Sequence, residues 1–572
     1  MHSFAMKRCP ECRRDYYDDS LIYCLDDGAR LLEGPAPDGP PTAVMPSAQS
    51  SSEAATRTFD NRNTTHESLA PGLIRRKRAT LLAVSVSVIV LIALIGWAAY
   101  SYFGGKSARQ IGSIAVMPFV NAGGNPDIEY LSDGLTESLI NSLSKIPALS
   151  VKARSSVFSY KGREVTPQQV AKDLSVEAVL NGRVVQRGDQ IVLNVELVDA
   201  VTGNQIWGDQ YTRRMTDLVA LQSEIAGDVS GNLRAKLTGE ERTKIARSHT
   251  ANTDAYQLYL RGRHHWNKRR GEDLRKSIEF FQQAIDKDPT YALAYASLAE
   301  AFILVPNYRI GSPQEYYPKA RAAATKAIEI DESLAEAHNA LASVTCNYDW
   351  KFADAERGWQ RAIALNPNYA TAHQWYAEFL LSMARYPEAI AEMRRAQELD
   401  PLSPIINGMM GVALMLSDQP EPALEQLKKT LELDPNFPRT HLYLAEWYQD
   451  AGRYEEAIDE FSRHFSLAGG PAINIAEQAE NIRRAYRTGG PKAYARAFAE
   501  TIEKNQGPSG APAFVLAGYW AHAGESDRAF AILERAYAAH DDSILSLKDP
   551  RLDPIKSDPR YKDLLRRVGL PE

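Results

Sequence analysis

Three prolines in the second half of the chain are spaced 34 residues apart, at positions 367, 401 and 435. Each follows an asparagine or aspartate, and proline cannot continue a helix because it lacks a backbone N–H and clashes with the preceding turn. An internal repeat of this length holds one helical hairpin, which cannot bury its apolar face alone. The spacing therefore predicts stacked helix pairs, an α-solenoid, instead of one closed core.

Residues of matching size recur inside successive repeats. Before Pro401 the large, small and aromatic positions hold His373, Tyr376, Ala377, Leu380, Ala389, Met393 and Ala396, and before Gly469 they hold His441, Leu444, Ala445, Tyr448, Ala457 and Phe461. This pattern resembles that of tetratricopeptide repeats, in which small residues let the two helices of a hairpin approach closely. Repeats are expected over residues 253–470, with starts near Ala255, Ala292, Ala335, Ala370, Pro404 and Pro438, and residues 471–572 should add further helical repeats and a C-terminal cap.

The first helices of the predicted hairpins should line the concave face of the solenoid, which is the usual site of partner binding. The residues expected to face this groove are Tyr259, Arg263, Trp266, Glu300, Glu336, Asn339, Gln374, Glu378, Met415, Arg439, Leu442, Glu446 and Gln449. Their charges are mixed and faintly acidic. The sequence thus predicts a protein or peptide partner of unknown identity and no small-molecule substrate, and a peptide with some basic character is one hypothesis.

Three histidines, His338, His373 and His441, recur at equivalent repeat positions. A ladder of metal ligands is one interpretation of this recurrence. Successive copies should lie about a helix diameter apart, however, which is too far to share one ion. We therefore expect each histidine to pack between the two helices of its own repeat.

The chain carries no charged residue from Ala79 to Phe103. A helix of this length can span a hydrocarbon core of about 30 Å, so the segment predicts one transmembrane helix. Four basic residues precede it at positions 75–78, whereas only Lys106 and Arg109 follow closely, and this bias places the N-terminus in the cytoplasm. The expected localisation is the inner (cytoplasmic) membrane, single-pass, with the C-terminal domains outside the cytoplasm. Residues 34–78, rich in proline, glycine, serine and threonine, are typical of a disordered linker.

Residues 1–33 contain Cys9 and Cys12 two residues apart, then Cys24, and Asp27 where a second pair would have its fourth cysteine. A two-residue gap lets one tight turn present two thiolates to a tetrahedral ion. The segment resembles the small zinc-ribbon modules at the N-terminus of many bacterial proteins, from which it departs at Asp27. We expect a structural zinc ion on these four residues, with His2 or Asp26 as substitutes for Asp27; the alternative is a metal-free ribbon.

Residues 110–240 alternate between β-rich and helical segments. Strands are expected at 113–120, 149–153, 179–186, 190–200 and 205–212, and helices at 131–145, 167–174 and 218–237. The phrases SIAVMPFVN, VEAVLNGRVVQRGDQIVLNVELVDAVTGNQIWGDQY and LQSEIAGDV resemble the TolB amino-terminal-domain-like family. That resemblance implies a mixed α/β recognition domain, found in bacterial membrane-attached proteins before tetratricopeptide repeats, and it brings no catalytic residues.

Composition and motifs narrow the function further. A 44% apolar and 24% charged chain is neither collagen-like nor wholly disordered. Its 66 basic and 72 acidic residues give a net charge of -6, which argues against broad nucleic-acid binding. Because no zinc-protease, nucleophile-elbow, kinase or phosphate-loop motif occurs, no enzyme is expected. The predicted function is a membrane-anchored interaction scaffold or signal receiver; the alternative is a membrane-tethered regulator whose zinc-ribbon-like module contacts nucleic acid or a transcription complex.

Overall fold

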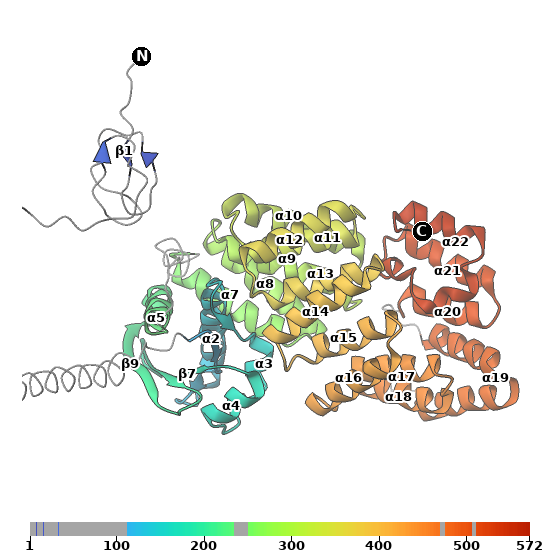
Figure 1. Ribbon diagram of the computed structural model, residues 1–572, viewed down its shortest axis with the longest axis horizontal. Helices are drawn as coiled ribbons and strands as arrows, with labels where there is room; N and C mark the ends of the chain where they lie inside the picture. The colour runs from blue at the N-terminus through green and yellow to red at the C-terminus, as the bar shows by residue number, and fades with distance from the viewer. Residues whose placement is uncertain are drawn as a thin grey trace, which may run out of the picture. The chain divides into compact units, whose positions relative to one another are not determined.

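The computed structural model describes residues 7–8, 15–16, 32–33, 111–233, 250–468, 475–505 and 511–571. The chain divides into two compact units, residues 1–105 and 106–572. In the first unit, three short strands form an antiparallel sheet in the order β2-β1-β3 (Figure 1). These strands are β1 (Lys7–Arg8), β2 (Asp15–Tyr16) and β3 (Leu32–Glu33). The predicted zinc ligands Cys9, Cys12, Cys24 and Asp27 lie outside the described residues.

The predicted localisation in the inner membrane requires correction. Within the described ranges, no helix combines the length and the apolar character that a membrane crossing needs. The apolar helices there are short: α9 (Ala292–Asn307) has 16 residues and α15 (Pro404–Leu416) has 13, against the roughly 20 that a span requires. The expected span at 79–103 lies outside the described residues.

The larger unit begins with a small mixed α/β domain. Its six-stranded sheet has the order β6-β4-β7-β8-β9, with β5 paired to β7. The strands are β4 (Ser113–Val116), β5 (Val120–Asn121), β6 (Ser150–Val151), β7 (Ala178–Arg187), β8 (Gln190–Asp199) and β9 (Gln205–Arg214). The strand β4 runs parallel to β6 and β7, whereas β7, β8 and β9 form an antiparallel meander.

The helices of this domain are α2 (Glu129–Ser144), α3 (Arg154–Phe158), α4 (Pro167–Leu174) and α5 (Leu218–Asn232). Of these, α2, α4 and α5 follow the expected apolar periodicity. The β7–β8 hairpin turns at Gly188, whose φ of 62° is a conformation that glycine adopts without strain. Both α2 and α5 pack against the sheet and against each other, which gives the domain its core.

Six helix pairs follow and form the repeat array (Figure 1). Their helices are α7 (Thr253–Asn267) and α8 (Gly271–Lys287), α9 and α10 (Pro313–Ile330), α11 (Ala335–Asn347) and α12 (Phe352–Leu365), α13 (Ala370–Ser382) and α14 (Tyr386–Leu399), α15 and α16 (Pro420–Leu433), and α17 (Pro438–Asp450) and α18 (Tyr454–Leu467). A Cβ at Gly411 would lie 2.5 Å from the Leu427 side chain, so the two helices of that pair need a glycine at their crossing.

The last part of the chain is helical but leaves the 34-residue register. Its elements are α19 (Ile475–Asn505), α20 (Ala513–His522), α21 (Ser526–Ala538), the 3-10 helices η3 (Asp542–Ser546) and η4 (Pro550–Ile555), and α22 (Pro559–Val568). Helix α19 is kinked at Gly490, whose φ of 65° and ψ of -159° are not helical. We refer to residues 511–571 as the C-terminal segment.

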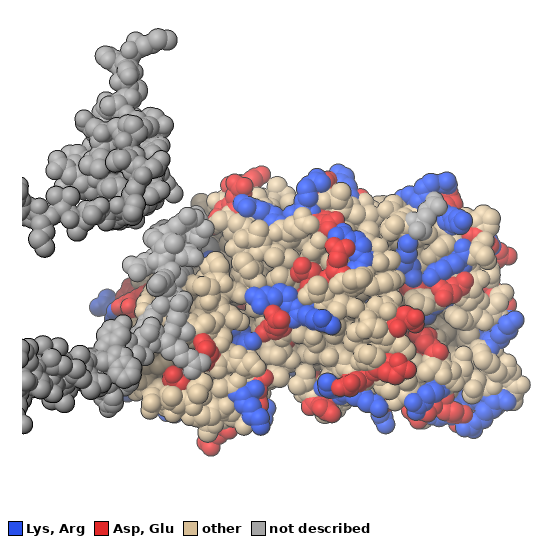
Figure 2. Space-filling model, viewed as in Figure 1, with Lys and Arg blue, Asp and Glu red and all other residues tan. Residues whose placement is uncertain are grey.

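Surface charges on the larger unit are interspersed. Figure 2 shows basic and acidic side chains mixed over the viewed face, without a field of one sign. Many are short-range pairs within one helix, such as Lys276 with Glu272 and Lys429 with Glu425. Exposed pairs of this kind contribute little to stability.

Candidate functional site

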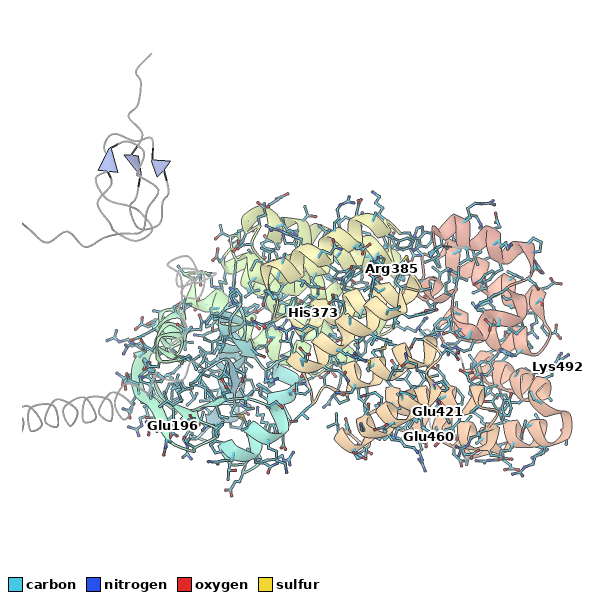
Figure 3. The ribbon with its side chains drawn as sticks, in the orientation of Figure 1. Glu196, His373, Arg385, Glu421, Glu460 and Lys492 are labelled. Carbon is cyan, nitrogen blue, oxygen red and sulfur yellow. The ribbon has the colours of Figure 1, made fainter. Side chains whose placement is uncertain are left out.

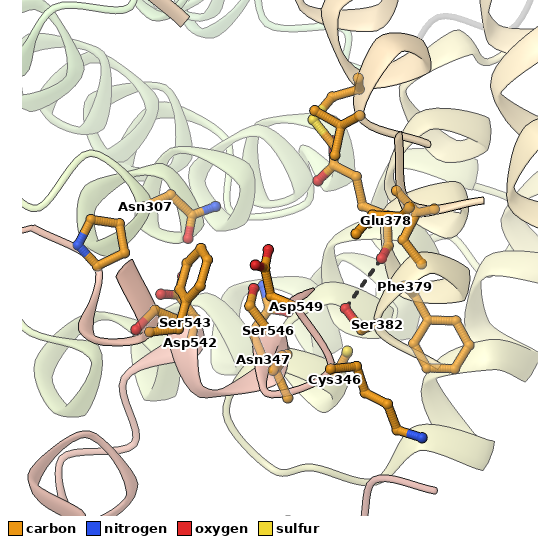
Figure 4. Close-up of a pocket in the computed structure, with 18 of the residues that line it drawn as sticks. Asn307, Cys346, Asn347, Glu378, Phe379, Ser382, Asp542, Ser543, Ser546 and Asp549 are labelled. Carbon is orange, nitrogen blue, oxygen red and sulfur yellow. Dashed lines mark hydrogen bonds between the residues drawn. The ribbon is translucent and has the colours of Figure 1, made fainter. Parts of the chain in front are cut away.

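A cavity of about 390 Å³ lies inside the repeat array (Figure 4). Its walls come from the inner helices α9, α11, α13, α15 and α17, and from the C-terminal segment. Much of the lining is aromatic or aliphatic, including Trp375, Phe379, Tyr386, Leu442 and Phe514. This volume falls within the range of about 300–1,000 Å³ that is typical of ligand pockets.

The C-terminal segment closes this cavity by reaching back to the second and third repeats. Asp541 forms an ion pair with Arg309 at 3.5 Å, and the Tyr317 hydroxyl donates to Asp542 at 3.1 Å. Nearby, His540 stacks on Trp350 with ring centroids 4.5 Å apart. The segment was expected to cap the last apolar face; it also lies across the concave side of the array.

Arg551 of this segment is held in the cavity wall by two carboxylates. Its Nε and Nη2 each lie 2.7 Å from one oxygen of Asp549, and its Nη1 donates to Glu446 of α17. The guanidinium also lies over the Phe514 ring, 4.7 Å from the centroid. Burial raises the pKa of Glu446 to about 7, although the charge of Arg551 acts against this shift. The cavity therefore already holds one cation between acidic and aromatic groups.

Glu378 on α13 is a further acidic group of the cavity wall, and it has no ion-pair partner among the described residues. The Gln374 amide donates to its Oε1 at 2.9 Å. Burial raises the pKa of Glu378, an effect that the Gln374 hydrogen bond and the more distant charge of Arg439 reduce. Trp375 and Ser382 precede and follow Glu378 by three and four residues, so the three lie on one face of α13.

The α/β domain covers the first part of the same concave face. Arg263 of α7 lies between two carboxylates, with Nε 2.7 Å from Glu137 Oε1 and Nη1 3.0 Å from Glu300 Oε2. Glu137 belongs to α2 and also pairs with Arg154 at 3.1 Å. The Tyr369 hydroxyl donates to the other oxygen of Glu300 at 2.7 Å. This buried network ties the α/β domain to the first, second and fourth repeats.

Loops between repeats complete the docking of that domain. Asn368, which follows Pro367, donates to the carbonyls of Ser144, Ile146 and Leu149 at the end of α2 and just beyond it. One repeat later, Asp400 accepts hydrogen bonds from the hydroxyls of Ser155 and Ser156. Burial raises the pKa of Asp400, and the two serines oppose that shift. The residues that end helices in the repeat pattern thus also bind a neighbouring domain.

The predicted groove residues do not form one continuous surface. Gln374, Glu378, Leu442 and Glu446 come together at the cavity. Arg263 and Glu300 belong to the network that holds the α/β domain. Three other predicted groove residues are buried: Tyr259, Trp266 and Asn339. Gln449 accepts hydrogen bonds from the hydroxyls of Tyr494 and Tyr519. The side chains of Glu336 and Met415 are partly buried, and that of Arg439 is exposed.

Sequence reasoning missed the residues that the C-terminal segment adds to the site. Arg551 and Asp549 come from the run of Asp-Pro dipeptides at η4, and Asp542 is the first residue of η3, which precedes that run. That run gives a local signal, because Asp549 caps its helix by accepting from the backbone N–H of Arg551. It gives no signal that this turn would meet Glu446, which lies 105 residues earlier.

The recurring histidines pack within their own repeats, as expected. His373 Nδ1 lies 2.6 Å from Glu392 Oε2, and its Nε2 lies 3.1 Å from the carbonyl of Pro367 (Figure 3). His441 makes the equivalent contacts with Glu460 and Pro435. In the described ranges, no group of three or more His, Cys, Asp or Glu side chains could hold a metal ion.

Comparison with known families matches two parts of the chain. Residues 109–226 match the second domain of HilA/YgeH-like transcriptional regulators, whereas a TolB amino-terminal-domain-like region was expected there from the sequence. Residues 351–404 match the tetratricopeptide repeat. The chain is thus a tetratricopeptide solenoid preceded by a small mixed α/β domain, an architecture that serves as a protein–protein interaction scaffold.

Three relatives show how far the similarity extends. A putative adenylate cyclase 3 of Rhizobium meliloti is 34% identical over 232 residues, which is 40% of this chain and 39% of the relative. The transcriptional regulator HilA of Salmonella typhimurium is 21% identical over 293 residues, or 50% of this chain and 51% of HilA. The type IV pilus assembly protein PilF of Pseudomonas aeruginosa is 30% identical over 155 residues, or 27% of this chain and 60% of PilF. A solved PilF structure has a TM-score of 0.28 at 24% identity and covers 36% of this chain and 90% of that one.

The first of these relatives corrects one prediction. The sequence predicted that the chain is no enzyme, and the match to a protein named as an adenylate cyclase contradicts this. The prediction failed because a search for known motif spacings detects only those spacings. The chain spans about two fifths of the cyclase and half of HilA.

Proposed function

We propose that the chain is a regulatory interaction scaffold that binds a segment of a partner protein in the cavity of its repeat array. The cavity carries this proposal, because it combines apolar walls with a few polar groups on the inner helices of a tetratricopeptide solenoid. The buried contacts of Arg263 and Asn368 hold the α/β domain against the same repeats. Binding in the cavity is thereby coupled to the position of that domain.

The similarity to relatives with different names supports a role in binding a partner, which proteins of different activity can share. The chain is similar to parts of a protein named as a cyclase and of one named as a transcriptional regulator. A scaffold that receives a protein signal suits both names. In our proposal this part of each protein supplies partner recognition.

The test is a selection of random peptides displayed on phage against the full chain. Peptides that bind in the cavity should be enriched, and Val412→Trp, which places a large ring in the cavity lining, should lose them by tenfold or more in affinity. Val201→Trp is the matched control because Val201 is 59% exposed and lies outside the lining. Equal binding by both variants, or no enrichment with the wild-type chain, would overturn the proposal.

A second candidate is a regulator that contacts nucleic acid or a transcription complex through its N-terminal module. The match of residues 109–226 to a domain of transcriptional regulators favours it. The balanced charge of the chain weighs against binding to nucleic acid alone. Fluorescence anisotropy of the full chain with a labelled DNA duplex, at two salt concentrations, decides this point: salt-sensitive binding supports the candidate.

A structural zinc ion in the N-terminal module remains part of this proposal. The described strands β1, β2 and β3 flank the cysteine positions in sequence and pair with one another, as the strands of a small ribbon do. Three thiolates and the carboxylate of Asp27 are a donor set that suits zinc. Metal analysis of the purified chain should give one zinc per chain, lost in the Cys9→Ser, Cys12→Ser double variant and kept in Cys346→Ala.

A further inference from the structure

The cavity contains more acidic than basic side chains. Its lining includes four carboxylates, Glu378, Glu446, Asp542 and Asp549, but only two cations, Lys548 and Arg551. Arg551 is engaged by Glu446 and Asp549. Glu378, Asp542 and Lys548 remain, and neither of these two carboxylates has an ion-pair partner among the described residues. The charge that is left inside the cavity is therefore negative.

We propose that the cavity selects a basic side chain of the bound protein segment, with Glu378 as its counter-ion. This inference rests on the proposed function, since it names the chemistry of the segment that the scaffold binds. A carboxylate in an apolar wall has lost part of its hydration, and a cation supplied by the partner compensates that loss. Among the described residues, Glu378 has a hydrogen bond from the Gln374 amide and the more distant charge of Arg439, so a cation in direct contact would stabilise its carboxylate further.

Arg551 shows that the cavity wall can hold a guanidinium. Two carboxylates bind it in the plane of its N–H groups, and the Phe514 ring lies against its face. Glu378 has comparable surroundings, because Trp375 and Phe379 on its own helix and Tyr443 on α17 line the same cavity. Aromatic faces attract cations in addition to their apolar contacts. A second basic side chain would thus find an acidic and aromatic environment of the same kind.

Asp542 plays a smaller part in this selection. Its carboxylate already accepts a hydrogen bond from Tyr317, and it lies near the charge of Arg309. No hydroxyl group of the described residues donates to the Glu378 carboxylate, and the Ser382 hydroxyl donates to the Glu378 backbone carbonyl instead (Figure 4). The two carboxylates also come from different elements of the wall, α13 and η3. The test therefore concentrates on Glu378.

The experiment compares two synthetic peptides by titration calorimetry with the full chain. The first is acetyl-Gly-Leu-Arg-Leu-Gly-amide, and the second replaces arginine with citrulline, which has nearly the same shape but no charge. The arginine peptide should bind the wild-type chain about tenfold more tightly, as expected for a charged hydrogen bond in an apolar site. In Glu378→Gln the ratio between the two peptides should fall to about one.

Control variants separate a local effect from a general one. Glu421→Gln removes a carboxylate from the exposed first turn of α16 and should keep the tenfold ratio (Figure 3). Thermal unfolding followed by circular dichroism establishes that Glu378→Gln is folded. A Glu378→Asp variant, which keeps the charge, should retain a preference for the arginine peptide.

Each other outcome overturns the inference in a distinguishable way. If both peptides bind equally and Val412→Trp abolishes both, the cavity binds protein segments without selecting a basic residue, and the proposed function stands. If arginine amide binds as tightly as the peptide, the ligand is a small cation and not a protein segment. If neither peptide binds, the selection of a basic residue is wrong, and the phage selection decides the proposed function independently.

Discussion

The guanidinium of Arg263 is bound by the carboxylate of Glu137, from a helix 126 residues earlier in the chain. Both side chains are buried, with 13% and 7% of their side-chain surfaces exposed. Burial alone would raise the pKa of Glu137, but Arg263 and Arg154 outweigh it and hold the pKa below its ordinary value. Glu137 is therefore ionised, and the α/β domain is joined to the repeats through charge.

Arg263→Met should destabilise the chain strongly. The substitution takes from Glu300 its ion-pair partner and leaves Glu137 with Arg154 alone, and breaking a buried ion pair in this way costs about 3–5 kcal/mol. Urea unfolding followed by circular dichroism measures the loss. The exposed pair of Lys276 and Glu272 provides the control, since Lys276→Met should leave the free energy of unfolding nearly unchanged. Equal losses of unfolding free energy in the two variants would show that the Arg263 network stabilises the chain no more than an exposed ion pair does.

Asn368→Ala should loosen the contact between the α/β domain and the fourth repeat. The variant removes the Asn368 amide from the carbonyls of Ser144 and Leu149, whereas the Ile146 carbonyl keeps the Leu149 N–H, at an expected cost of about 1–3 kcal/mol. Asn436 occupies the same position two repeats later and is exposed, so Asn436→Ala is a matched control. Hydrogen exchange at the end of α2, residues 140–150, should become faster in the first variant and stay unchanged in the second.

Arg551→Met should release the turn that closes the cavity. Glu446 and Asp549 would then face each other without a cation, which again costs about 3–5 kcal/mol. Hydrogen exchange measured by mass spectrometry should rise over residues 540–556. Arg560 makes exposed pairs with Asp527 and Asp558, so Arg560→Met should leave this exchange as in the wild type. Unchanged exchange in Arg551→Met would show that other contacts suffice to hold the turn.

Stability should fall as the pH rises toward neutrality. Burial raises the pKa of Asp542 from 3.8 to about 6, with Asp541 adding to the shift and Arg309 and Tyr317 opposing it. Between these values the native state keeps a proton that the unfolded chain has lost, so the stabilisation present below about pH 4 disappears as the pH passes 6.

Asp542→Asn tests this pH dependence because an amide cannot ionise. The decrease in melting temperature between pH 4.5 and 7 should become smaller by about 2–4 °C. It will not vanish, since Glu446 and Asp450 have pKa values raised to about 7 and 6. The control Glu421→Gln should keep the full decrease. The same decrease in Asp542→Asn as in the wild type would mean that Asp542 does not titrate in this range.

The repeat hairpins were predictable because their signals are local. The expected starts Ala292, Ala335, Ala370, Pro404 and Pro438 are the first residues of their helices, and Ala255 lies two residues inside α7. Proline and small residues act within one hairpin, so their spacing determines where helices begin and cross. The strands of the α/β domain follow the same logic, and β8 begins at the expected Gln190. The five-residue helix α3 was missed because so short a segment carries no periodicity.

The contents of the groove could not be predicted in the same way. In an isolated solenoid, side chains on the concave face are open to solvent. Periodicity alone therefore places Arg263 and Glu446 on a solvent-exposed surface. In the folded chain their partners are Glu137 and Arg551, which lie 126 residues before and 105 residues after them. Such contacts depend on how segments dock over long distances, and no spacing in the sequence records this. The middle of the predicted groove, around Glu378, still lines the cavity.

The return of the C-terminal segment to Arg309 and Tyr317 fixes the number of repeats. An open solenoid can gain or lose a hairpin at modest cost, because each repeat contacts only its neighbours. Here the same segment binds Glu446 in the sixth repeat and Arg309 after the first helix of the second. A hairpin inserted between Arg309 and Glu446 would move these two residues apart by the width of one repeat, and the C-terminal segment could then not contact both. The number of repeats is therefore fixed in this chain, although it usually varies among solenoid proteins.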